Sequence, residues 1–192
     1  MSLDTLDTRP LRADARRNRE RVLAAARETF AADGLEAQVD DVARRAGVGV
    51  GTVYRHFPTK EALVEAVADA GYRELCAIAR DCLDREGDPW EAFSDFMWRG
   101  ARMHRHDRAQ CEIHSTRPDL VQRVSGDKHE LLELVASLIE RGQAAGVLRE
   151  DLSADDMPTI WCSLGAAQQR SADDALWERY LQVVLDGLRS RR

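Results

Sequence analysis

Apolar residues recur at helical spacing along most of this chain. Leu23, Ala26 and Phe30 fall on one face of a first predicted helix, and Asp33 and Gly34 supply its end. The same period of three to four residues returns in the later apolar segments. The pattern therefore predicts an all-α fold.

The segment 38–60 predicts two short helices joined by a tight turn. Asp40 and Asp41 suit the positive end of the first helix dipole, and Gly47 is suited to end that helix. The second helix begins near Val50 and ends at Pro58. The predicted inward-facing residues are Val42, Ala43, Ala46, Val53 and Phe57. The predicted outward-facing residues are Thr52, Arg55 and His56. This helix-turn-helix arrangement places its second helix in the major groove of DNA.

A longer helix is predicted to follow. Thr59 can cap its first turn, and the pattern ends at Gly87-Asp88-Pro89. Its apolar stripe consists of Leu63, Val67, Ala70, Tyr72, Leu75, Ile78 and Leu83. We expect one helix of about 26 residues, shared by two domains, so that an event in the C-terminal domain repositions the N-terminal one.

The next segment is the most aromatic part of the chain. Its apolar residues are Trp90, Phe93, Phe96, Met97, Trp98 and Met103. Such a stripe is either packed core or the lining of a ligand pocket in a helical bundle. Both interpretations remain open at this point.

Three further helices are predicted. One continues from Pro118, has a possible break at Gly126, and is closed by Gly142 and Gly146. Its stripe is Leu131, Leu132, Val135, Leu138 and Ile139. Ser153 with Asp156 is a start signal for the next helix, which carries Ile160 on its apolar side. The last helix spans about 174–188 and carries Leu176, Tyr180, Leu181, Val184, Leu185 and Leu188.

The last two predicted helices are apolar over a wider arc than one small core requires. Gly165, Ala166 and Ala167 would let two helix backbones approach closely, so twofold pairing with a second copy gives a four-helix interface. The predicted interface residues are Met157, Trp161, Leu164, Ala167, Tyr180, Leu181 and Val184. The alternative is that both faces pack inside one chain.

Charge is distributed unevenly along the chain. Overall, 28 Lys and Arg stand against 34 Asp and Glu, a net charge of −6. Residues 1–60 hold 11 basic and 9 acidic residues, whereas the remainder holds 17 and 25. From Val42 to Lys60 the charged residues are all basic: Arg44, Arg45, Arg55 and Lys60. A basic segment in an acidic chain favours a DNA-binding head on a body that does not bind DNA.

Other interpretations of this segment exist. Gly47, Gly49 and Gly51 before a helix also fit a fragment of a nucleotide phosphate loop, but that loop follows a buried strand and residues 42–47 are charged with a helical pattern. The plainer alternative is a corner between two bundle helices. It leaves the acid-free basic segment unexplained.

The segments RERVLAAARETFAADG and VARRAGVGVGTVYRHFPTKEALVEAV together resemble the N-terminal DNA-binding domain of the tetracycline-repressor (TetR) family of transcription regulators. The resemblance covers about Arg16 to Val67. Its specific features are the Ala-Gly-Val turn, the pair Tyr54 and Phe57, and Lys60. Many members have a serine where this chain has Gly49, and glycine caps a helix nearly as well. The departure bears on a phosphate contact from that hydroxyl and not on the motif.

The resemblance implies a homodimeric regulator of double-stranded operator DNA, most often a repressor, that an apolar small molecule releases. We expect a flexible arm (1–15), a DNA-binding domain (16–61) and a ligand-binding and dimerisation domain (62–192). Two recognition helices about 34 Å apart would read a pseudo-palindrome. The expected pocket residues are Trp90, Phe93, Phe96, Met97, Met103 and Trp161.

The recognition helix divides into two kinds of expected contact. Val50, Thr52 and Arg55 are assigned to base edges, because a methyl group can meet thymine and a guanidinium can meet guanine. Phosphate contacts are assigned to positions that match the family and carry donors. These are Arg44, Tyr54, His56 and Lys60, with Gly49 at the start of the helix.

Arginines crowd the start of the first predicted helix. They are Arg12, Arg16, Arg17, Arg19 and Arg21. Arg17 and Arg21 stand one turn apart and repel each other, which a DNA phosphate would relieve. The alternative is that these side chains are simply solvated.

Compartment and chemistry narrow the function further. The chain has no run of about 18 apolar residues and no apolar stretch in its first 15, so neither a membrane span nor a secretory signal is expected. Cysteines at 76, 82, 111 and 162 form no close pairs, which favours reduced thiols in the cytoplasm.

A metal- or thiol-responsive DNA-binding sensor is the alternative function. His104, His106, Cys111 and His114 are of metal-ligating types, although their spacing matches no zinc pattern. No nucleophile, base and orienting group stand in a catalytic pattern. We expect no metal, no cofactor and no enzyme activity.

Overall fold

The computed structural model describes residues 9–104, 112, 126–170 and 173–190. Within these residues the regular structure is helical, and the only extended pairing is an isolated bridge between Leu148 and Arg189. The predicted all-α fold is confirmed. The elements are α1 (Arg9–Asp33), η1 (Gly34–Glu36), α2 (Val39–Ala46), α3 (Val50–His56), α4 (Lys60–Asp84), α5 (Pro89–His104), α8 (Gly126–Ala144), η2 (Ala154–Asp156), α9 (Met157–Arg170) and α10 (Asp174–Leu188).

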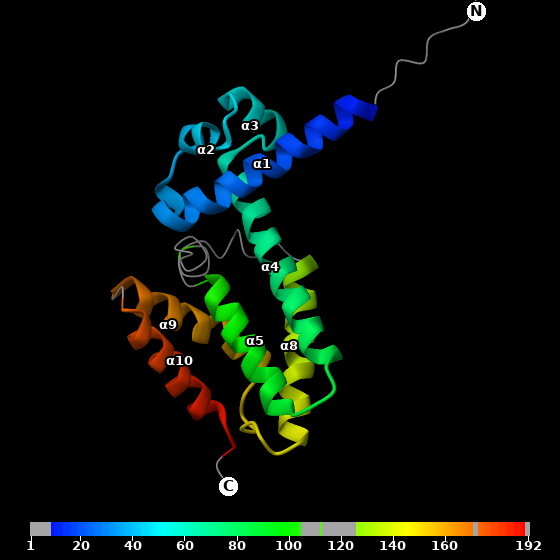
Figure 1. Cartoon of the computed structure of the whole chain (residues 1–192), viewed down its shortest axis with the longest axis vertical. Coiled ribbons are helices and arrows are strands. Elements are labelled where there is room, and N and C mark those ends of the chain that lie inside the picture. The colour runs from blue at the N-terminus through cyan, green and yellow to red at the C-terminus, as the bar shows by residue number, and fades with distance from the viewer. Residues whose placement is uncertain (1–8, 105–111, 113–125, 171–172, 191–192) are drawn as a thin grey trace, which may run out of the picture.

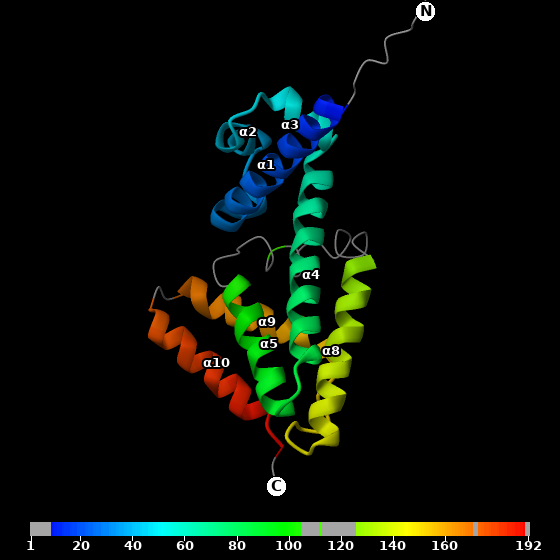
Figure 2. The ribbon, with the colours of Figure 1, turned by 45° about the vertical axis from the view of Figure 1, so that its right-hand side comes forward.

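The helices form two groups (Figures 1 and 2). Helices α1, α2 and α3 lie at one end of the molecule, and α5, α8, α9 and α10 lie at the other. Helix α4 passes from the first group into the second, and it contacts α1 in one group and α5 and α8 in the other. Because both groups pack on one continuous helix, α4 links them mechanically.

Helix α1 begins earlier than the sequence indicated. It starts at Arg9, so residues 9–15, which were expected in a flexible arm, belong to the helix, while residues 1–8 lie outside the described part. The ion pairs of Arg16 with Glu20 and of Arg17 with Asp14 offset the repulsion among the arginines. On the inner face Ala26 and Phe30 are fully buried as predicted, but Leu23 is only half-buried.

Helix α4 is one helix of 25 residues, which confirms the predicted long helix. The Thr59 hydroxyl caps it by accepting a hydrogen bond from the Ala62 amide at 3.1 Å. Its buried face extends from Leu63 to Cys82. Ala70 and Leu83, which were placed on the apolar stripe, are half-buried at its edge.

A side chain of α8 closes the carboxyl end of α4. Arg141 donates hydrogen bonds to the carbonyls of Leu83 (3.2 Å), Arg85 (3.3 Å) and Gly87 (3.2 Å). A cation in this place complements the negative end of the helix dipole. The Asp88 carboxylate then accepts a hydrogen bond from the Trp90 amide at 2.8 Å, and α5 begins. The predicted break between the two helices is confirmed.

The described part of α8 begins at Gly126, while residues 113–125, including Pro118, lie outside the described part. Its buried residues are Leu131, Val135, Leu138, Ile139 and Gly142. Leu132, predicted to be on the same stripe, is half-buried. Four of the five predicted core residues of this helix therefore face the core.

Local signals start the last two helices. The Asp156 carboxylate accepts a hydrogen bond from the Ser153 amide at 2.8 Å, so the predicted start signal is confirmed, although the turn it caps is η2 and α9 follows. Asp173 caps α10 by accepting a hydrogen bond from the Ala175 amide at 2.9 Å. Beyond α10 the chain is held by a hydrogen bond from the Ser190 amide to the Val147 carbonyl at 3.0 Å.

Three residues predicted for a dimer interface lie in the core of their own chain. Met157 and Leu164 are 2% exposed and Leu181 is 0% exposed. A side chain that its own chain already covers offers no area to a second copy, so these three assignments are corrected. The exposed large apolar residues of α10 are Leu176, Tyr180 and Val183.

Two further expectations concern the described residues only. Within them no helix is both long and apolar enough to cross a membrane. Cys76, Cys82 and Cys162 carry free thiols, and Cys111 lies outside the described part.

Candidate nucleic-acid interface

Helix α2 and the turn after it are fixed by local hydrogen bonds. Gln38 and Asp41 form a capping box, in which the backbone N–H of Gln38 donates to the Asp41 carboxylate at 3.3 Å. Gly47 ends the helix with a φ of 65°, a left-handed conformation that glycine adopts without a Cβ clash. The Val48 amide then donates to the Ala43 carbonyl at 3.0 Å. The turn therefore has a defined exit direction toward α3.

Helix α3 buries one face and exposes the other. Val53 is 0% and Phe57 3% exposed, whereas Tyr54 is 46% exposed and Arg55 is also exposed. Thr52, His56 and Val50 are half-buried. Val53 and Phe57 lie inward as predicted, whereas Arg55 is the exposed one of the three residues predicted to face outward. The exposed side chains of Tyr54 and Arg55 lie outside the buried core, so folding does not use this face of α3 and it is available for binding.

The basic residues around α3 are weakly paired. Arg44 forms an ion pair with Asp41 at 2.8 Å, and Arg45 forms one with Glu28 at 3.6 Å, both among exposed side chains. Exposed pairs of this kind contribute at most about 1 kcal/mol, so a phosphate can replace the carboxylate at little cost. Among the described residues, Arg55 and Lys60 form no ion pair. Beside Arg44 and Arg45 lies a cavity of about 290 Å³, also lined by Thr29, Asp33 and Asp41.

Two arginines of α1 have protein partners that the sequence did not reveal. Arg21 donates hydrogen bonds to the carbonyls of Ala46 at 3.0 Å and Gly47 at 3.4 Å. The Arg19 guanidinium lies over the Phe57 ring, 5.0 Å from its centroid. These contacts join residues that are far apart in the chain, and two of the acceptors are backbone carbonyls. The spacing of side chains in the sequence therefore does not predict them. The side chain of Arg12 lies outside the described part.

The glycines of the turn do not form a nucleotide phosphate loop. They follow α2, a helix, where such a loop follows a buried strand. Of Gly47, Gly49 and Gly51, only Gly47 has a positive φ. At Gly49 and Gly51 a Cβ would meet open space.

The aromatic segment of α5 is largely core. Phe93, Phe96 and Met97 are 0% exposed, while Trp90 and Met103 are half-buried at the edge of the core. Trp161 of α9 packs against Phe96 with ring centroids 5.5 Å apart, and Trp90 lies 6.4 Å from Phe93. None of these residues lines either of the described cavities. Their role in a ligand pocket stays a prediction.

Polar groups beside this core are held neutral. Burial raises the pKa of the Tyr72 phenol to about 12, and interaction with Cys162 adds to the shift. Burial also raises the pKa of the Cys76 thiol to about 11, with Glu130 as the second cause. The Cys76 thiol donates to the Asp127 carbonyl, with Sγ and the oxygen 3.4 Å apart. The Tyr72 phenol and the Cys76 thiol are therefore uncharged near neutral pH.

The predicted metal-ligand types cannot be placed together. His106, Cys111 and His114 lie outside the described residues, as does the side chain of His104. Within the described residues, no three His, Cys, Asp or Glu side chains converge as metal ligands. The metal-sensing alternative has no support from the described part of the molecule.

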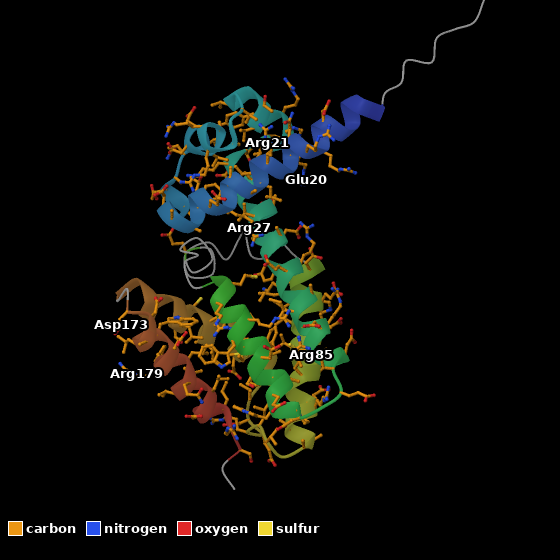
Figure 3. The ribbon with its side chains drawn as sticks, in the orientation of Figure 1. Glu20, Arg21, Arg27, Arg85, Asp173 and Arg179 are labelled. Carbon is orange, nitrogen blue, oxygen red and sulfur yellow. The ribbon has the colours of Figure 1, made fainter. Side chains whose placement is uncertain are left out.

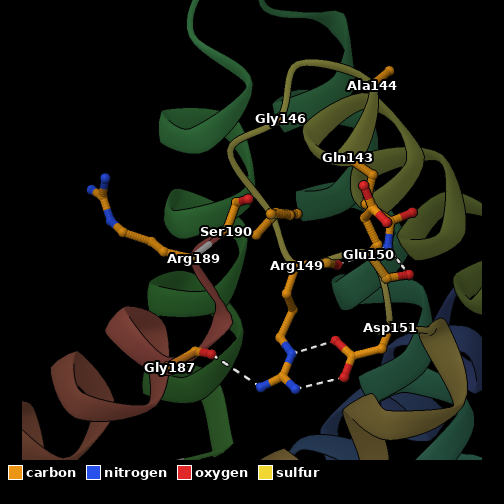
Figure 4. Close-up of a pocket in the computed structure, with 10 residues that line it drawn as sticks. Gln143, Ala144, Gly146, Arg149, Glu150, Asp151, Gly187, Arg189 and Ser190 are labelled. Atoms are coloured by element: carbon orange, nitrogen blue, oxygen red, sulfur yellow. Dashed lines mark hydrogen bonds and ion pairs between the residues drawn. The ribbon is translucent and has the colours of Figure 1, made fainter. Parts of the chain in front are cut away.

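A cavity of about 580 Å³ lies between the loop after α8 and the end of α10 (Figure 4). Arg149 spans it, binding the Asp151 carboxylate at 2.5 and 2.6 Å and the Gly187 carbonyl at 3.3 Å. Gln143 donates to three carbonyls of the same loop, including that of Leu152 at 2.9 Å. The polar groups of Arg149 and Gln143 are bound to neighbouring protein groups. They connect the loop after α8 to the end of α10, which is a structural role.

Both parts of the chain match known family models. Residues 22–67 match the model described as bacterial regulatory proteins, tetR family. Residues 88–190 match the model described as transcriptional regulator SbtR-like, C-terminal domain. Together the two matches extend over both helix groups.

Similar proteins agree with these matches. A TetR transcription regulatory protein from Mycobacterium vanbaalenii is 40% identical, with a TM-score of 0.64 over 94% of this chain and 99% of that one. The TetR transcriptional regulator SCO0520 from Streptomyces coelicolor is 31% identical, with a TM-score of 0.63 over 91% and 99%. The HTH-type transcriptional repressor KstR2 from Mycolicibacterium smegmatis is 28% identical over 184 residues, 88% of this chain and 90% of that protein. This chain therefore belongs to the TetR family of DNA-binding transcriptional regulators.

Proposed function

We propose that this protein is a homodimeric repressor that holds operator DNA through α3 and releases it when an apolar small molecule binds in the C-terminal domain. The outer face of α3 carries the proposal. There Tyr54 and Arg55 are exposed on a helix anchored by Val53 and Phe57, at the end of the molecule away from α10 (Figure 1). A short helix of this kind fits the major groove, about 12 Å wide.

The proposed contacts follow the two faces of α3. Val50, Thr52 and Arg55 would meet base edges, and Gly49 would lie close to the duplex. Phosphates would be held by the donors near these residues that keep exposed or half-buried surface. These are Arg44, Tyr54, His56 and Lys60.

A homodimer is supported by the outer face of α10. Leu176, Tyr180 and Val183 are 44%, 36% and 66% exposed and stand at i, i+4 and i+7, so they form one apolar stripe. Of the predicted interface residues, Trp161, Ala167, Tyr180 and Val184 retain exposed or half-buried surface. Twofold pairing would bury both stripes and place two copies of α3 about 34 Å apart.

The proposed effector site lies where α4, α5 and α9 meet. Gly100 of α5 lies so close to both neighbours that a Cβ there would be 3.0 Å from the Trp161 indole and 3.2 Å from Leu75. There Phe96 would supply an apolar wall and Tyr72 a neutral polar group. An apolar molecule with one polar group would suit this region. The relative KstR2 is named a transcriptional repressor, and this supports repression rather than activation by this protein.

The proposal assigns the chain a binding role with no catalytic step and no cofactor, in the cytoplasm with its operator DNA. The division into residues 16–61 and 62–192 is part of it. It places the boundary at the start of α4, where the linking helix leaves the DNA-binding head.

Anisotropy titrations with a duplex selected by the wild-type protein from a random pool test the proposal. Arg55→Ala should reduce the preference for the selected duplex over random DNA by about 1–3 kcal/mol. Lys60→Ala should weaken binding to the selected duplex and to random DNA equally. It should also lower the slope of log affinity against log salt by about one unit, since it removes one phosphate contact. A wild-type protein that shows no sequence preference would sink the proposal.

A further inference from the structure

We propose that Arg21 of α1 is a positioning residue for the recognition helix: it fixes the turn between α2 and α3 from the protein side and contacts no phosphate. This inference rests on the proposed docking of α3. It concerns a residue whose charge and exposure alone would place it among the DNA contacts (Figure 3).

The backbone of the turn leaves a place for this side chain. Amides within the turn serve the carbonyls of Ala43 and Arg44, through hydrogen bonds from Val48 at 3.0 Å and from Gly47 at 3.2 Å. Arg21 Nη2 donates to two further carbonyls of the turn, those of Ala46 at 3.0 Å and Gly47 at 3.4 Å. Arg21 therefore supplies hydrogen bonds to two carbonyls at the end of α2 and in the turn.

The electrostatics favour the same arrangement. The last carbonyls of α2 carry the negative end of its dipole, and a guanidinium there is attracted to them. The acceptors belong to Ala46, the last residue of α2, and to Gly47, whose φ of 65° sets the change of direction. Since α3 begins three residues later, at Val50, holding these carbonyls holds the start of the recognition helix.

A second contact from α1 holds the other end of α3. The Arg19 guanidinium lies 5.0 Å from the centroid of the Phe57 ring, and Phe57 is the C-cap residue that directly follows α3. Arg21 at the turn and Arg19 at Phe57 thus hold both ends of the seven-residue helix against α1. A short helix with few internal hydrogen bonds depends on such contacts for its orientation.

Salt dependence separates positioning from phosphate contact. Each lost phosphate contact lowers the slope of log affinity against log salt by about one unit, whereas a disordered turn lowers affinity at every salt concentration and leaves the slope unchanged. Arg21→Met retains the length of the side chain without its donors. Arg27→Met is the matched control, because it removes the same group from the same helix, where Arg27 pairs with Glu74 of α4 and, among the described residues, makes no hydrogen bond or ion pair with the turn.

The test uses the full-length protein, the selected duplex and hydrogen exchange of the free protein. Arg21→Met should bind about tenfold more weakly at all salt concentrations with the wild-type slope, and amides 47–50 should exchange faster. Arg27→Met should match the wild type in both measurements. If Arg21→Met melts below the assay temperature, Arg21→Lys replaces it, with the same expected direction for affinity and exchange.

A slope lowered by about one unit would overturn the inference in favour of a phosphate contact. Unchanged affinity or wild-type exchange at residues 47–50 would overturn it as well. Lys60→Ala in the same titration distinguishes failure of the positioning role of Arg21 from failure of the proposed docking of α3. If Lys60→Ala lowers the slope and Arg21→Met has no effect, only the positioning role fails. If neither has an effect, the docking of α3 fails too.

Discussion

Gly51 occupies an exposed place in the first turn of α3 for which neither folding nor packing requires glycine. Its φ is not positive, and a Cβ would meet open space. Glycine in a helix costs about 0.5–1 kcal/mol relative to alanine. If α3 docks as proposed, the missing side chain allows the backbone to approach the duplex closely.

Gly51→Ala should therefore raise the free energy of unfolding by about 0.5 kcal/mol and weaken duplex binding. Urea unfolding and anisotropy measure the two effects. Gly126→Ala, at an open position at the start of α8, is the control and should leave binding unchanged. Wild-type affinity in Gly51→Ala would mean that α3 approaches DNA by another face.

The buried thiol of Cys76 gives the protein an alkaline pH dependence. Its pKa rises from 9.0 to about 11 on folding, so the folded state favours the protonated thiol. That contribution to stability is complete below pH 9 and is lost as the pH rises through about 11. Urea midpoints at pH 8 and pH 10.5 should therefore fall less in Cys76→Ala than in the wild type. Equal falls would assign the alkaline loss to other groups, such as Tyr72.

At the scale of elements, the end of α4 depends on one side chain from α8. Arg141 serves three carbonyls there, and Arg141→Met leaves them without this donor. We expect a loss of about 1–3 kcal/mol in the free energy of unfolding, measured in urea. Arg80→Met removes an exposed pair with Glu130 between the same two helices and should cost less than about 1 kcal/mol. Equal losses in the two variants would contradict the capping role.

The elements also show what the sequence could and could not predict. Helix ends marked by local chemistry, such as Thr59 before α4 and Gly47 after α2, appear where they were predicted. The division of α3 followed from the spacing of Val53 and Phe57, which is local too. The partners of Arg21 and Arg141 are backbone carbonyls of distant residues, for which no side-chain pattern exists.

The sequence also could not show which side of the apolar helix α10 faces the core of its own chain. Periodicity identifies α10 as apolar over a wide arc but does not distinguish the side that meets its own core from the side left outside. Leu181 proved to be inside and Val183 outside. That distinction depends on how α10 sits against the rest of the bundle, and it decides which residues are available to a second copy.

For the whole molecule, reading a pseudo-palindrome requires that two copies pair through a fixed surface. The stripe formed by Leu176, Tyr180 and Val183 lies on α10, at the opposite end of the molecule from α3 (Figure 2). A pairing there leaves both copies of α3 free to reach one duplex. Spacing between the two recognition helices would then be set by α4 and the α10 interface together.

Val183→Glu should break this pairing, because the interface would have to bury an unpaired carboxylate, which costs several kcal/mol. Light scattering should show a monomer, and affinity for a two-half-site duplex should fall to that for a single half-site. Ala175→Glu is the matched control: it adds the same charge at an exposed position of the same helix, about 100° around the helix from Leu176 and off the stripe. A dimeric Val183→Glu protein with wild-type affinity would place the interface elsewhere, and loss of pairing in both variants would show a general effect of charge.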